Sequence, residues 1–295
     1  MRRDAAHGGA AHGGAAAGAA RGFMTTPIDT TRPNVARMYD YWLGGKDNFE
    51  ADRKAAEAIR KTRPNIAEQA LDNKKFQTRA VTYVAGLGIR QFVDLGSGLP
   101  TSPIQEWGQP PLWLSTHEAA GGIVDDPVVA YVDYDPVAVR HSRAMLASGS
   151  SRVVAVTADM RDAEKILAHA HIREAGFRPE EPACVILGCV LHFVDATTAR
   201  GIVTALAGAL ASGSYLIISV GFGAGPAGSE FASTYNAQDG PRIYAHSWDQ
   251  IMAMFDGLDL IPPGVVDVSV WHPEWPEPAP TERSNMIVGG VGRRP

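Results

Sequence analysis

The chain has 295 residues, 45% of them hydrophobic, and a formal net charge of -5 at pH 7. This length predicts about two domains, or one domain with a substantial addition, in an ordinary globular protein. The acidic balance offers no basic field for a phosphate backbone, which argues against nucleic acid as a partner. No run of residues approaches the ~20 apolar side chains that a membrane span needs, so we expect a cytoplasmic protein without membrane attachment.

Residues 1–30 are predicted to form a disordered tail. The tract 1–22 is mostly Ala and Gly, so it cannot bury enough apolar surface to fold alone. Two arginines near its start imitate a signal peptide, but no Leu- or Val-rich segment follows them, so export is not expected. The histidines of the tract, His7 and His12, are expected to bind no metal. Met24 is an alternative start of translation.

Residues 31–88 are predicted to form a helical cap that precedes a sheet. Apolar side chains recur at helical spacing, and Gly44-Gly45 ends the first helical run. Pro64 is expected in the first turn of the third helix, where its missing N–H is not needed. The first helix has an apolar face of Val35, Met38, Tyr39 and Trp42, the second runs from Asn48 to Lys61, and the third runs from Ile66 to Leu87.

A glycine-rich turn follows the first predicted strand. The segment Phe92-Val93-Asp94-Leu95-Gly96-Ser97-Gly98 is an apolar run that ends in Asp-x-Gly-x-Gly. Gly96 and Gly98 have no Cβ atoms, so the backbone can adopt positive φ and lie against a ligand. This turn comes at the carboxyl end of a strand, where open α/β sheets place their sites. A dinucleotide fingerprint needs a third glycine where this chain has Thr101, so NAD is not the expected cofactor.

Two more predicted strands are followed by carboxylates. Residues 128–133 close with Asp133 beside Tyr134, and residues 152–157 are followed by Asp159 and Met160. A carboxylate accepts hydrogen bonds from both ribose hydroxyls at once, and a tyrosine ring offers a flat face to adenine. Asp159 is then within reach of an adenine amino group. Each acid alone also fits a turn or a helix cap, but acids at three strand ends predict an adenosine site.

A further strand, residues 183–188, leads to the region where an acceptor is expected. Gly188 permits close approach of a ligand at the strand end. His192 titrates near neutrality and can take a proton from an acceptor hydroxyl or amine; the alternative is a structural histidine bonded to backbone. Cys189 lacks a partner for a nucleophilic role. Cys184 and Cys189 are assigned to opposite faces of this strand, so we expect reduced thiols.

The spacing between Asp94 and Asp133 predicts an insertion. The two acids are 39 positions apart, against the ~20 typical of a nucleotide-binding βαβ unit. Residues 103–115, which contain Trp107 and Trp113, are the expected extra chain. Two tryptophans on a loop can cover an apolar ligand or pack against each other on the surface, and both readings stay open.

The remaining chain completes the predicted sheet. A Gly-rich passage that ends at Gly228 is expected to be a mobile rim. Asp135 and Asp162 are predicted to cap helices. The predicted elements are a helix from Ala196 to Leu210, a strand from Ser214 to Val220, a capping box at Ser247 and Gln250, and an antiparallel hairpin of residues 265–271 with residues 285–291. Arg242, Tyr244 and His246 can contact an acceptor or form a solvated connector.

Five phrases carry a resemblance to a known family. They are Arg37-Met38-Tyr39-Asp40-Tyr41-Trp42-Leu43-Gly44-Gly45-Lys46-Asp47-Asn48-Phe49, Asn73-Lys74-Lys75-Phe76, Gly98-Leu99-Pro100-Thr101, Val190-Leu191-His192-Phe193-Val194 and Pro263-Gly264-Val265-Val266. Over residues 32–295 the chain resembles class I S-adenosylmethionine-dependent methyltransferases of a bacterial, mostly actinobacterial, family long catalogued as a domain of unknown function. It departs from the family pattern at Lys74, where Arg is usual, at Val220, where His is usual, and at His272, where Arg is usual.

The resemblance implies a Rossmann-like α/β sheet of seven strands with an antiparallel last hairpin, in a domain of residues 89–295, beneath the helical cap. It also implies S-adenosyl-L-methionine as cofactor and in-line transfer of its methyl group to an unidentified small-molecule acceptor. The residues expected at the cofactor are Asp94, Gly96, Ser97, Gly98, Asp133, Tyr134, Asp159, Met160, Tyr39 and Gly188. His192 is the candidate catalytic residue, and Tyr39 and Tyr41 are candidates for orienting the acceptor or for packing.

Two other classes of function are weighed against this one. A non-catalytic regulator that binds S-adenosylmethionine would keep Asp94, Gly96, Gly98 and Asp133 but lack an acceptor pocket. A dehydrogenase on a similar sheet would need nicotinamide binding, which Thr101 and the Leu99-Pro100 turn disfavour.

Overall fold

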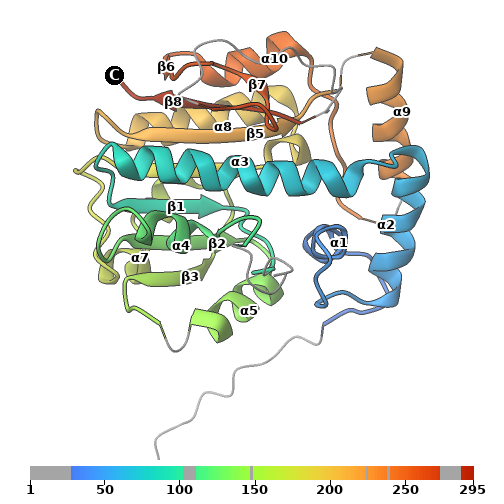
Figure 1. Ribbon diagram of the computed structural model, residues 1–295, viewed down its shortest axis with the longest axis horizontal. Helices are drawn as coiled ribbons and strands as arrows, with labels where there is room; N and C mark the ends of the chain where they lie inside the picture. Colours follow the sequence, from blue (N-terminus) through green and yellow to red (C-terminus); the bar gives the residue numbers. More distant parts are fainter. Residues whose placement is uncertain (1–27, 102–110, 147–148, 224, 238–239, 273–286) are drawn as a thin grey trace, which may run out of the picture.

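The computed structural model describes residues 28–101, 111–146, 149–223, 225–237, 240–272 and 287–295, and its centre is one mixed β-sheet (Figure 1). The strands follow the order β3-β2-β1-β4-β5-β8-β6, and β7 pairs with β8. Strands β1 to β5 are parallel, whereas β8 runs antiparallel to its neighbours. The strands are β1 Gln91–Leu95, β2 Val128–Asp133, β3 Val153–Thr157, β4 Cys184–Gly188, β5 Tyr215–Gly221, β6 Asp259–Leu260, β7 Val266–Asp267 and β8 Ile287–Arg293.

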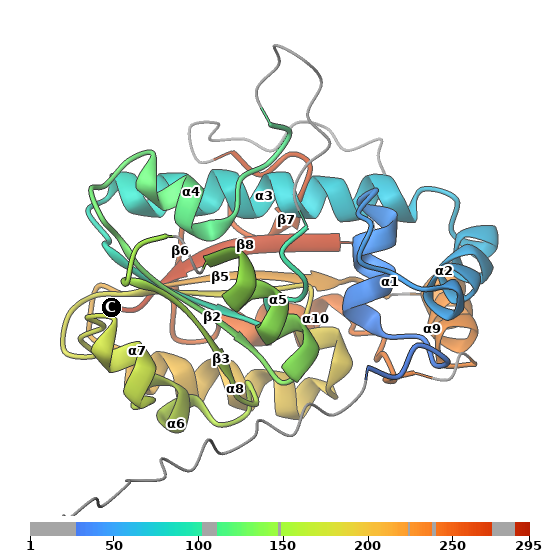
Figure 2. The ribbon, with the colours of Figure 1, turned by 90° about the horizontal axis from the view of Figure 1, so that it is seen from below.

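Helices cover both faces of this sheet (Figure 2). The helices are α1 Val35–Trp42, α2 Glu50–Thr62, α3 Ile66–Gly86, α4 Thr116–Gly121, α5 Pro136–Leu146, α6 Ala163–Leu167, α7 Ala170–Glu174, α8 Ala196–Ala209, α9 Gly225–Asn236 and α10 Trp248–Met252, with 3-10 turns η1 Leu191–Phe193 and η2 Ala253–Phe255. Helices α3 and α4 share a core with Phe92 and Ile186. Helices α6, α7 and α8 share another with Val93 and Leu187. Because neighbouring residues of β1 and β4 face opposite cores, these strands are apolar throughout, as parallel strands buried on both faces are.

A cap of α1, α2 and α9 lies beyond the carboxyl ends of the parallel strands, and α3 runs from this cap across the sheet (Figure 1). Met38 of α1 and Ile59 of α2 share a small apolar core with Tyr235 of α9 and with Ile243. The cap is therefore built from two segments that are far apart in the sequence.

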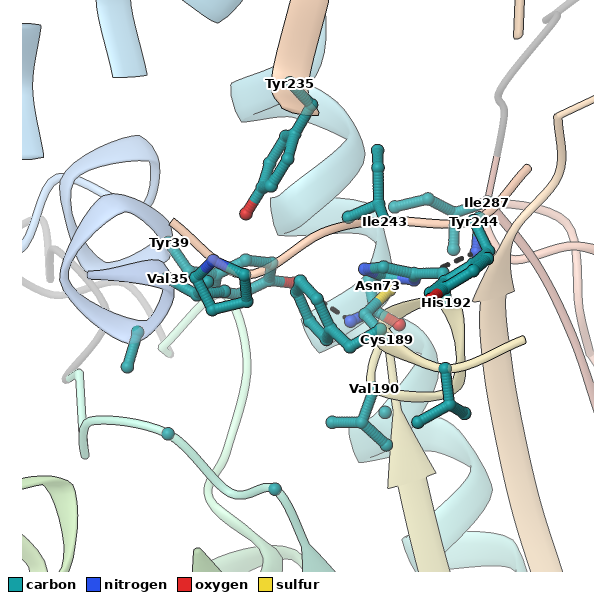
Figure 3. A pocket seen from close by; sticks show the side chains of 18 of the residues that line it. Val35, Tyr39, Asn73, Cys189, Val190, His192, Tyr235, Ile243, Tyr244 and Ile287 are labelled. Atoms are coloured by element: carbon teal, nitrogen blue, oxygen red, sulfur yellow. Dashed lines mark hydrogen bonds between the residues drawn. The ribbon is translucent and has the colours of Figure 1, made fainter. Parts of the chain in front are cut away.

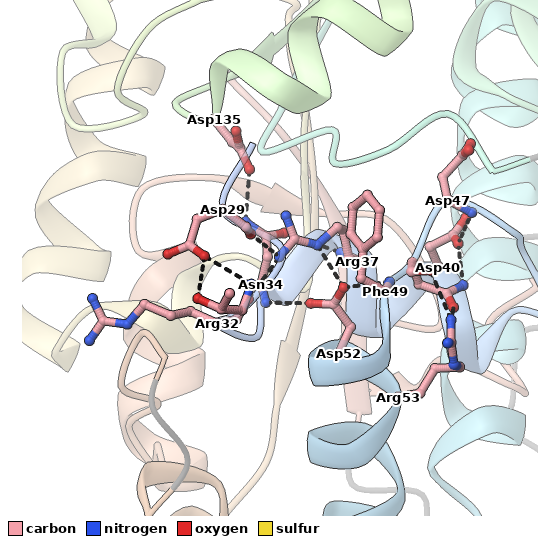
Figure 4. A network of polar contacts seen from close by, with 12 residues as sticks. Asp29, Arg32, Asn34, Arg37, Asp40, Asp47, Phe49, Asp52, Arg53 and Asp135 are labelled. Atoms are coloured by element: carbon pink, nitrogen blue, oxygen red, sulfur yellow. Dashed lines mark hydrogen bonds and ion pairs between the residues drawn. The ribbon is translucent and has the colours of Figure 1, made fainter. Parts of the chain in front are cut away.

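Buried polar contacts hold the start of this cap together (Figure 4). The Arg37 guanidinium forms an ion pair of 2.7 Å with Asp52, whose side chain is 0% exposed. Asp52 also accepts the backbone N–H groups of Asn34 and Phe49 at 2.8 Å. The side chain of Asn34 donates to Asp135 at 2.8 Å, so this network reaches the loop after β2.

A second link joins the cap to the glycine-rich loop. Asp40 of α1 accepts a hydrogen bond of 2.6 Å from the Thr101 hydroxyl. The cap is thus attached at two of the loops that follow the parallel strands.

The predicted fold class is confirmed, and the five parallel strands, β1 to β5, begin within one residue of their expected positions. The capping box of Ser247 and Gln250 and the cap at Asp135 are also present. The predicted hairpin is shorter than expected, because β7 pairs with β8 only at Val266 and Asp267. Edge strand β6 was not predicted.

Two local expectations were wrong, and a third stays a prediction. Part of the Gly-rich passage that ends at Gly228 opens helix α9, and the mobility expected of this rim stays a prediction. Pro64 lies before the N-cap of α3 rather than in its first turn. Cys189 follows β4 instead of belonging to it, and its φ of 57° turns the chain there; Cys184 and Cys189 are both free, buried thiols.

Other expectations fall on parts of the chain outside the described residues. These are the tail up to residue 27 and residues 103–110 of the expected insertion, including Trp107. The proposed domain limits remain predictions. In the part of the chain that is described, no helix combines the length and apolarity needed to cross a membrane.

Candidate functional site

A cavity of about 410 Å³ lies between the carboxyl ends of the parallel strands and the cap. Its floor comes from the loops after β1 to β5, and its roof comes from α1, α9 and residues 241–245. One side of α3 completes the wall. The cavity therefore lies where open α/β sheets bind their ligands.

The glycine-rich loop after β1 forms part of the floor. Gly96 and Gly98 have φ values of 67° and 66°, a conformation that favours glycine. A Cβ atom on Gly96 would come within 2.4 Å of Val190, so the loop packs tightly there. A Cβ on Gly98 would meet only Ala36, at 3.9 Å. The space before Gly98 is therefore open to a ligand.

Asp133, at the end of β2, lines the cavity, and both of its carboxylate oxygens accept hydrogen bonds. One oxygen accepts the Gly98 N–H at 2.9 Å, and the other accepts the Asp135 N–H at 2.8 Å. Burial raises the pKa of Asp133, and these two N–H groups oppose that change. Each oxygen keeps a second lone pair, so the carboxylate can accept two hydroxyl groups from a ligand.

Beyond β3, Asp159 and Met160 line the same cavity, as does Tyr134 after β2. Arg161 forms an ion pair with Asp159, and hydrogen bonding to this guanidinium lowers the pKa of Asp159. Asp159 is thus a fixed anion whose oxygens already have donors. Tyr134 is 63% exposed, so its ring is accessible at the rim.

Asp94 lies in a different place from the other predicted cofactor residues. It lines a second cavity of about 300 Å³, on the α3 and α4 side of β1. Its carboxylate accepts a hydrogen bond of 2.7 Å from Thr116, at the start of α4. Burial raises the pKa of Asp94, and the nearby charge of Lys74 opposes this. Ser97 and Gly98 line both cavities, so the two spaces adjoin at the glycine-rich loop.

The turn after β4 brings Gly188, Cys189 and His192 to the cavity (Figure 3). A Cβ atom on Gly188 would overlap the side-chain amide of Gln77, so this glycine makes room for α3. Burial raises the pKa of the Cys189 thiol to about 12, which leaves it protonated and poorly nucleophilic at neutral pH.

His192 is a neutral imidazole in this environment. Burial, and secondarily the proximity of His246, lowers the pKa of His192 to about 3. Its Nδ1 accepts the Gly221 N–H at 3.4 Å, so the proton of the neutral ring is on Nε2. A group with so low a pKa is a weak proton acceptor at neutral pH.

Acidification is expected to destabilise the fold through His192. The unfolded chain takes up a proton below about pH 6.5, whereas the folded chain does so only near pH 3. Between these values the free energy of unfolding therefore falls by about 1.4 kcal/mol for each unit of decreasing pH, and it gains nothing from this group above pH 6.5. Urea denaturation of the native protein and of His192→Gln between pH 7 and pH 4 measures this slope. If the free energy of unfolding changes with pH equally in both proteins, His192 is not the cause of the acid sensitivity.

Tyr39 and Asn73 connect the cap to the end of β5 across the cavity wall (Figure 3). Asn73 donates to the Tyr39 hydroxyl at 2.9 Å and accepts a hydrogen bond of 2.6 Å from Ser219. The Tyr39 hydroxyl donates to the backbone of Ala70, and burial raises its pKa well above the usual range. Tyr41 instead donates to Glu57 of α2, outside both cavities.

Several lining residues were missed from the sequence. Helix α9 contributes Phe231 and Tyr235, whose spacing of four residues is a helical signal just after the Gly-rich passage. Helix α3 contributes Gln69, Asn73, Lys74 and Gln77, a polar stripe on a helix side that faces inward. Polar residues at helical spacing usually indicate a solvent-exposed face. The sequence pattern of α3 therefore did not predict that these residues line a site.

The other candidates divide between the cavity and its surroundings. Tyr244 lines the cavity and donates its backbone N–H to His192 O at 2.8 Å. His246 is buried next to it and contacts the carbonyl of Leu191. Trp113, from the described end of the expected insertion, packs against Leu43 and lines the second cavity.

Comparisons with known proteins give a consistent result. Residues 22–295 match the model of a family described as S-adenosyl methyltransferase. A crystal structure of a candidate methyltransferase from Thermobifida fusca is 37% identical, with a TM-score of 0.80 over 90% of this chain and 96% of that one. A DUF574 family protein from Streptomyces avermitilis is 33% identical, with a TM-score of 0.78 over 91% of this chain and 100% of that one. Among curated proteins, none matches this chain.

Proposed function

This chain belongs to the S-adenosyl methyltransferase family and is an S-adenosyl-L-methionine-dependent methyltransferase; we propose that its methyl acceptor is a small molecule with an apolar, aromatic-sized body. The observation that carries this proposal is the single cavity that joins the loops after β1 to β3 to an apolar space under the cap. Its volume of about 410 Å³ lies within the roughly 300–1,000 Å³ of small-molecule sites.

The residues around the glycine-rich loop fit an adenosyl cofactor. Asp133 has lone pairs for the two ribose hydroxyls, and the exposed ring of Tyr134 beside it can stack on adenine. The open space before Gly98 allows the ligand to lie against backbone. When bound, S-adenosyl-L-methionine supplies an electrophilic methyl group on a sulfonium and leaves as neutral S-adenosylhomocysteine.

Each predicted cofactor residue receives a role in this proposal. Gly96, Ser97 and Gly98 form the backbone turn under the cofactor, Asp159 and Met160 border the adenine, Gly188 and Tyr39 border the reacting end, and Asp94 reaches the amino-acid end from the second cavity. Asp159 is already paired with Arg161, so its contact with adenine uses its remaining lone pairs.

The cap residues orient the acceptor and exclude water. Tyr39 and Asn73 are fixed by their hydrogen bonds to each other and to Ser219. Rigid walls of this kind hold two reactants in attack geometry, which contributes up to about 7–11 kcal/mol to lowering a barrier. Proximity is therefore the main contribution that these residues make to transfer.

His192 contributes as a neutral group in this proposal. Its pKa of about 3 keeps the imidazole uncharged across the neutral range, and burial disfavours a second positive charge close to a sulfonium. The predicted general base thus becomes a hydrogen-bonding wall residue, and the acceptor must itself be a competent nucleophile. A pH–rate profile without an ionisation near 6.5 is expected.

The acceptor side of the cavity has one polar atom without a partner. The Oε1 atom of Gln69 is buried and accepts no hydrogen bond among the described residues, and Gln69 is 1% exposed. Ile66, one turn before it on α3, and Trp42 and Phe231 give the same cavity apolar walls. An unsatisfied buried acceptor costs about 1–3 kcal/mol. We therefore infer that the methyl acceptor donates an N–H or O–H group to Gln69.

Replacing Gln69 by Leu is expected to separate stability from activity. The leucine removes an unpaired polar atom, so the free energy of unfolding stays equal or rises. The lost contact lowers kcat/KM for the acceptor by roughly 10- to 100-fold. Affinity for S-adenosylhomocysteine, measured by calorimetry, stays unchanged. Gln250→Leu, outside both cavities, is the control for activity: it removes the capping box with Ser247 and so lowers stability, but it leaves kcat/KM unchanged.

The acceptor class is tested with matched pairs of probes. Phenols, anilines and indoles are incubated with the protein and methyl-labelled S-adenosylmethionine, beside the same rings already O- or N-methylated. Formation of S-adenosylhomocysteine and labelled product from the free hydroxyl or amine compounds alone is expected. If the protein binds the cofactor but forms no product from any pair, the acceptor is not a small aromatic molecule. The non-catalytic regulator that binds S-adenosylmethionine would then be the better hypothesis.

A further inference from the structure

The charged groups around the larger cavity are divided between its two ends. Its carboxylates come from the loops after β2 and β3, at the end assigned to the cofactor; they are Asp133, Asp135 and Asp159. Among the described lining residues, α1, α3, α9 and residues 241–245 contribute no carboxylate. The end of α2 instead contributes the guanidinium of Arg63. The acceptor end of the cavity therefore favours an anionic group over a cationic one.

Arg63 is built into the wall of this cavity. The residue is 8% exposed, and its guanidinium carbon lies 4.1 Å from the centroid of the Phe231 ring. Contact with the ring face orients the guanidinium, whose N–H groups donate in its own plane. Its five donors allow it to keep contacts within the protein and still offer two to a ligand. Two parallel N–H groups of a guanidinium match the two oxygens of a carboxylate.

The burial of this cation gives an anionic ligand a further advantage. Desolvation lowers the pKa of Arg63, because its charge is poorly solvated in the wall. An arginine side chain nevertheless stays charged at neutral pH. A carboxylate that enters the cavity supplies an opposite charge in a place from which water is largely excluded, where the attraction is stronger than at the surface.

Tyr235 supplies a second donor beside the same aromatic ring. It lies one turn after Phe231 on α9, and the centroids of the two rings are 6.0 Å apart. Tyr235 is 6% exposed, and its hydroxyl points away from α9 into the cavity (Figure 3). In the part of the chain that the structure describes, this hydroxyl has no hydrogen-bond partner. Burial raises the pKa of the phenol, so it stays a donor at neutral pH.

We propose that the methyl acceptor is an acid whose carboxylate binds to Arg63 and Tyr235, on the two sides of Phe231. This inference rests on the proposed function and deepens it. The hydroxyl or amino group of the acceptor donates to Gln69, whose buried oxygen needs a donor. The ring of the acceptor lies between these polar ends, against Trp42 and Phe231. The substrate class is thus a small aromatic acid with a hydroxyl or amino group, and its carboxylate is the anchor rather than the site of methylation.

Pairs of probes that differ in charge alone test this class. 4-Hydroxybenzoate, 4-hydroxyphenylacetate and 3-(4-hydroxyphenyl)propionate place the acid at increasing distance from the hydroxyl. The primary amide of each has the same shape, ring and hydroxyl but no charge. Calorimetry on the full chain saturated with S-adenosylhomocysteine is expected to show that at least one acid binds roughly 10- to 100-fold more tightly than its amide. With methyl-labelled S-adenosylmethionine, that acid is labelled on its hydroxyl and keeps its free carboxylate.

Variants at the two residues assign this preference. Arg63→Met is expected to abolish the preference by weakening the acid alone, and Arg63→Lys is expected to keep part of it, because a positive charge remains. Tyr235→Phe retains the ring that packs with Met38 and Ile59, and it lowers affinity for the acid by roughly 3- to 10-fold. Affinity for S-adenosylhomocysteine stays at its native value in all three variants.

Arg60→Met and Tyr41→Phe are the matched controls for these variants. Arg60 lies one turn before Arg63 on α2, and its side chain is 54% exposed and pairs with Glu57. The Tyr41 hydroxyl donates to the same Glu57. Both residues lie outside the two cavities, so both variants are expected to keep the native preference for the acid.

Three results would overturn this inference while leaving the proposed function intact. One is equal binding of acids and amides by the native protein. Another is an equal loss for acid and amide in Arg63→Met, which would assign Arg63 a structural role. The third is a labelled methyl ester as product, because the acid group would then be the nucleophile. If the native protein binds neither acids nor amides, the small aromatic acceptor of the proposed function is wrong as well.

Discussion

Replacing Asp133 by Asn is expected to weaken binding of S-adenosyl-L-methionine by about a hundredfold, or about 2.7 kcal/mol. The two carboxylate oxygens accept N–H groups from Gly98 and Asp135. An asparagine has one oxygen, so its NH₂ group must face one of these donors. The turn at Gly98 loses its anchor, and the ribose loses a charge-assisted acceptor, each of which is worth about 1.5–3 kcal/mol.

Calorimetric titration of the purified protein measures this loss. Asp256→Asn is the matched control, because Asp256 forms an exposed ion pair with Arg200 far from the cavity. A cooperative thermal melt shows that the variant is folded. If Asp133→Asn binds S-adenosyl-L-methionine with native affinity, the ribose does not bind at Asp133, and the proposed orientation of the cofactor is wrong.

The largest effect on stability is expected at Arg37. Replacing it by Met leaves the Asp52 carboxylate, 0% exposed, without its cationic partner (Figure 4). Breaking a buried ion pair on one side costs about 3–5 kcal/mol. The loss is concentrated in the cap, since Asp52 also binds the start of α1 and α2 through Asn34 and Phe49. Urea denaturation measures the total loss in free energy of unfolding. Hydrogen exchange is expected to show that the amides of the cap lose most protection.

Two further variants test the reason for that loss. Adding Asp52→Asn to Arg37→Met removes the stranded charge and should restore at least about 1 kcal/mol. Lys54→Met breaks an exposed pair with Glu50, whose side chains are 74% and 73% exposed, and should change stability by less than about 0.5 kcal/mol. Equal effects from Arg37→Met and Lys54→Met would show that burial of the first pair is unimportant.

The sheet could be predicted from the sequence because its strands are unambiguous. Residues 128–133 and 183–188 are apolar runs of strand length, and both faces of a parallel sheet bury such residues. The acids and glycines that follow them stand at loop positions fixed by the strand ends. Each of these residues lies at or beside one of the two cavities for that reason.

The cap side of the site could not be predicted as well, because its signals are ambiguous. The glycines up to Gly228 led us to expect a mobile rim, but Phe231 and Tyr235 pack with α1 and α2 and stabilise helix α9. Gln69 and Lys74 read as an ordinary solvated helix side. Their place in the cavity wall depends on where α1 and α9 pack against α3, which no local pattern encodes.

The expected insertion was predicted in part: its presence was expected from the sequence, but the packing of its tryptophan was not. The spacing of the acids indicated extra chain, and the order of β1 and β2 is unaffected by it. Of its two tryptophans, Trp113 is buried against Leu43 and Ala70. Trp113 therefore contacts the cap and also lines the second cavity. It combines packing within the protein with a place beside a space for a ligand.

The shared core of the cap also determines when this protein can fold during synthesis. Met38 and Ile59 leave the ribosome early, but Tyr235 and Ile243, which pack against them, are made much later. Strand β8, inserted between β5 and β6, comes later still. Contacts so distant along the chain form slowly and leave apolar surface exposed in the meantime. The nascent cap is therefore a natural target for chaperones until the final elements emerge.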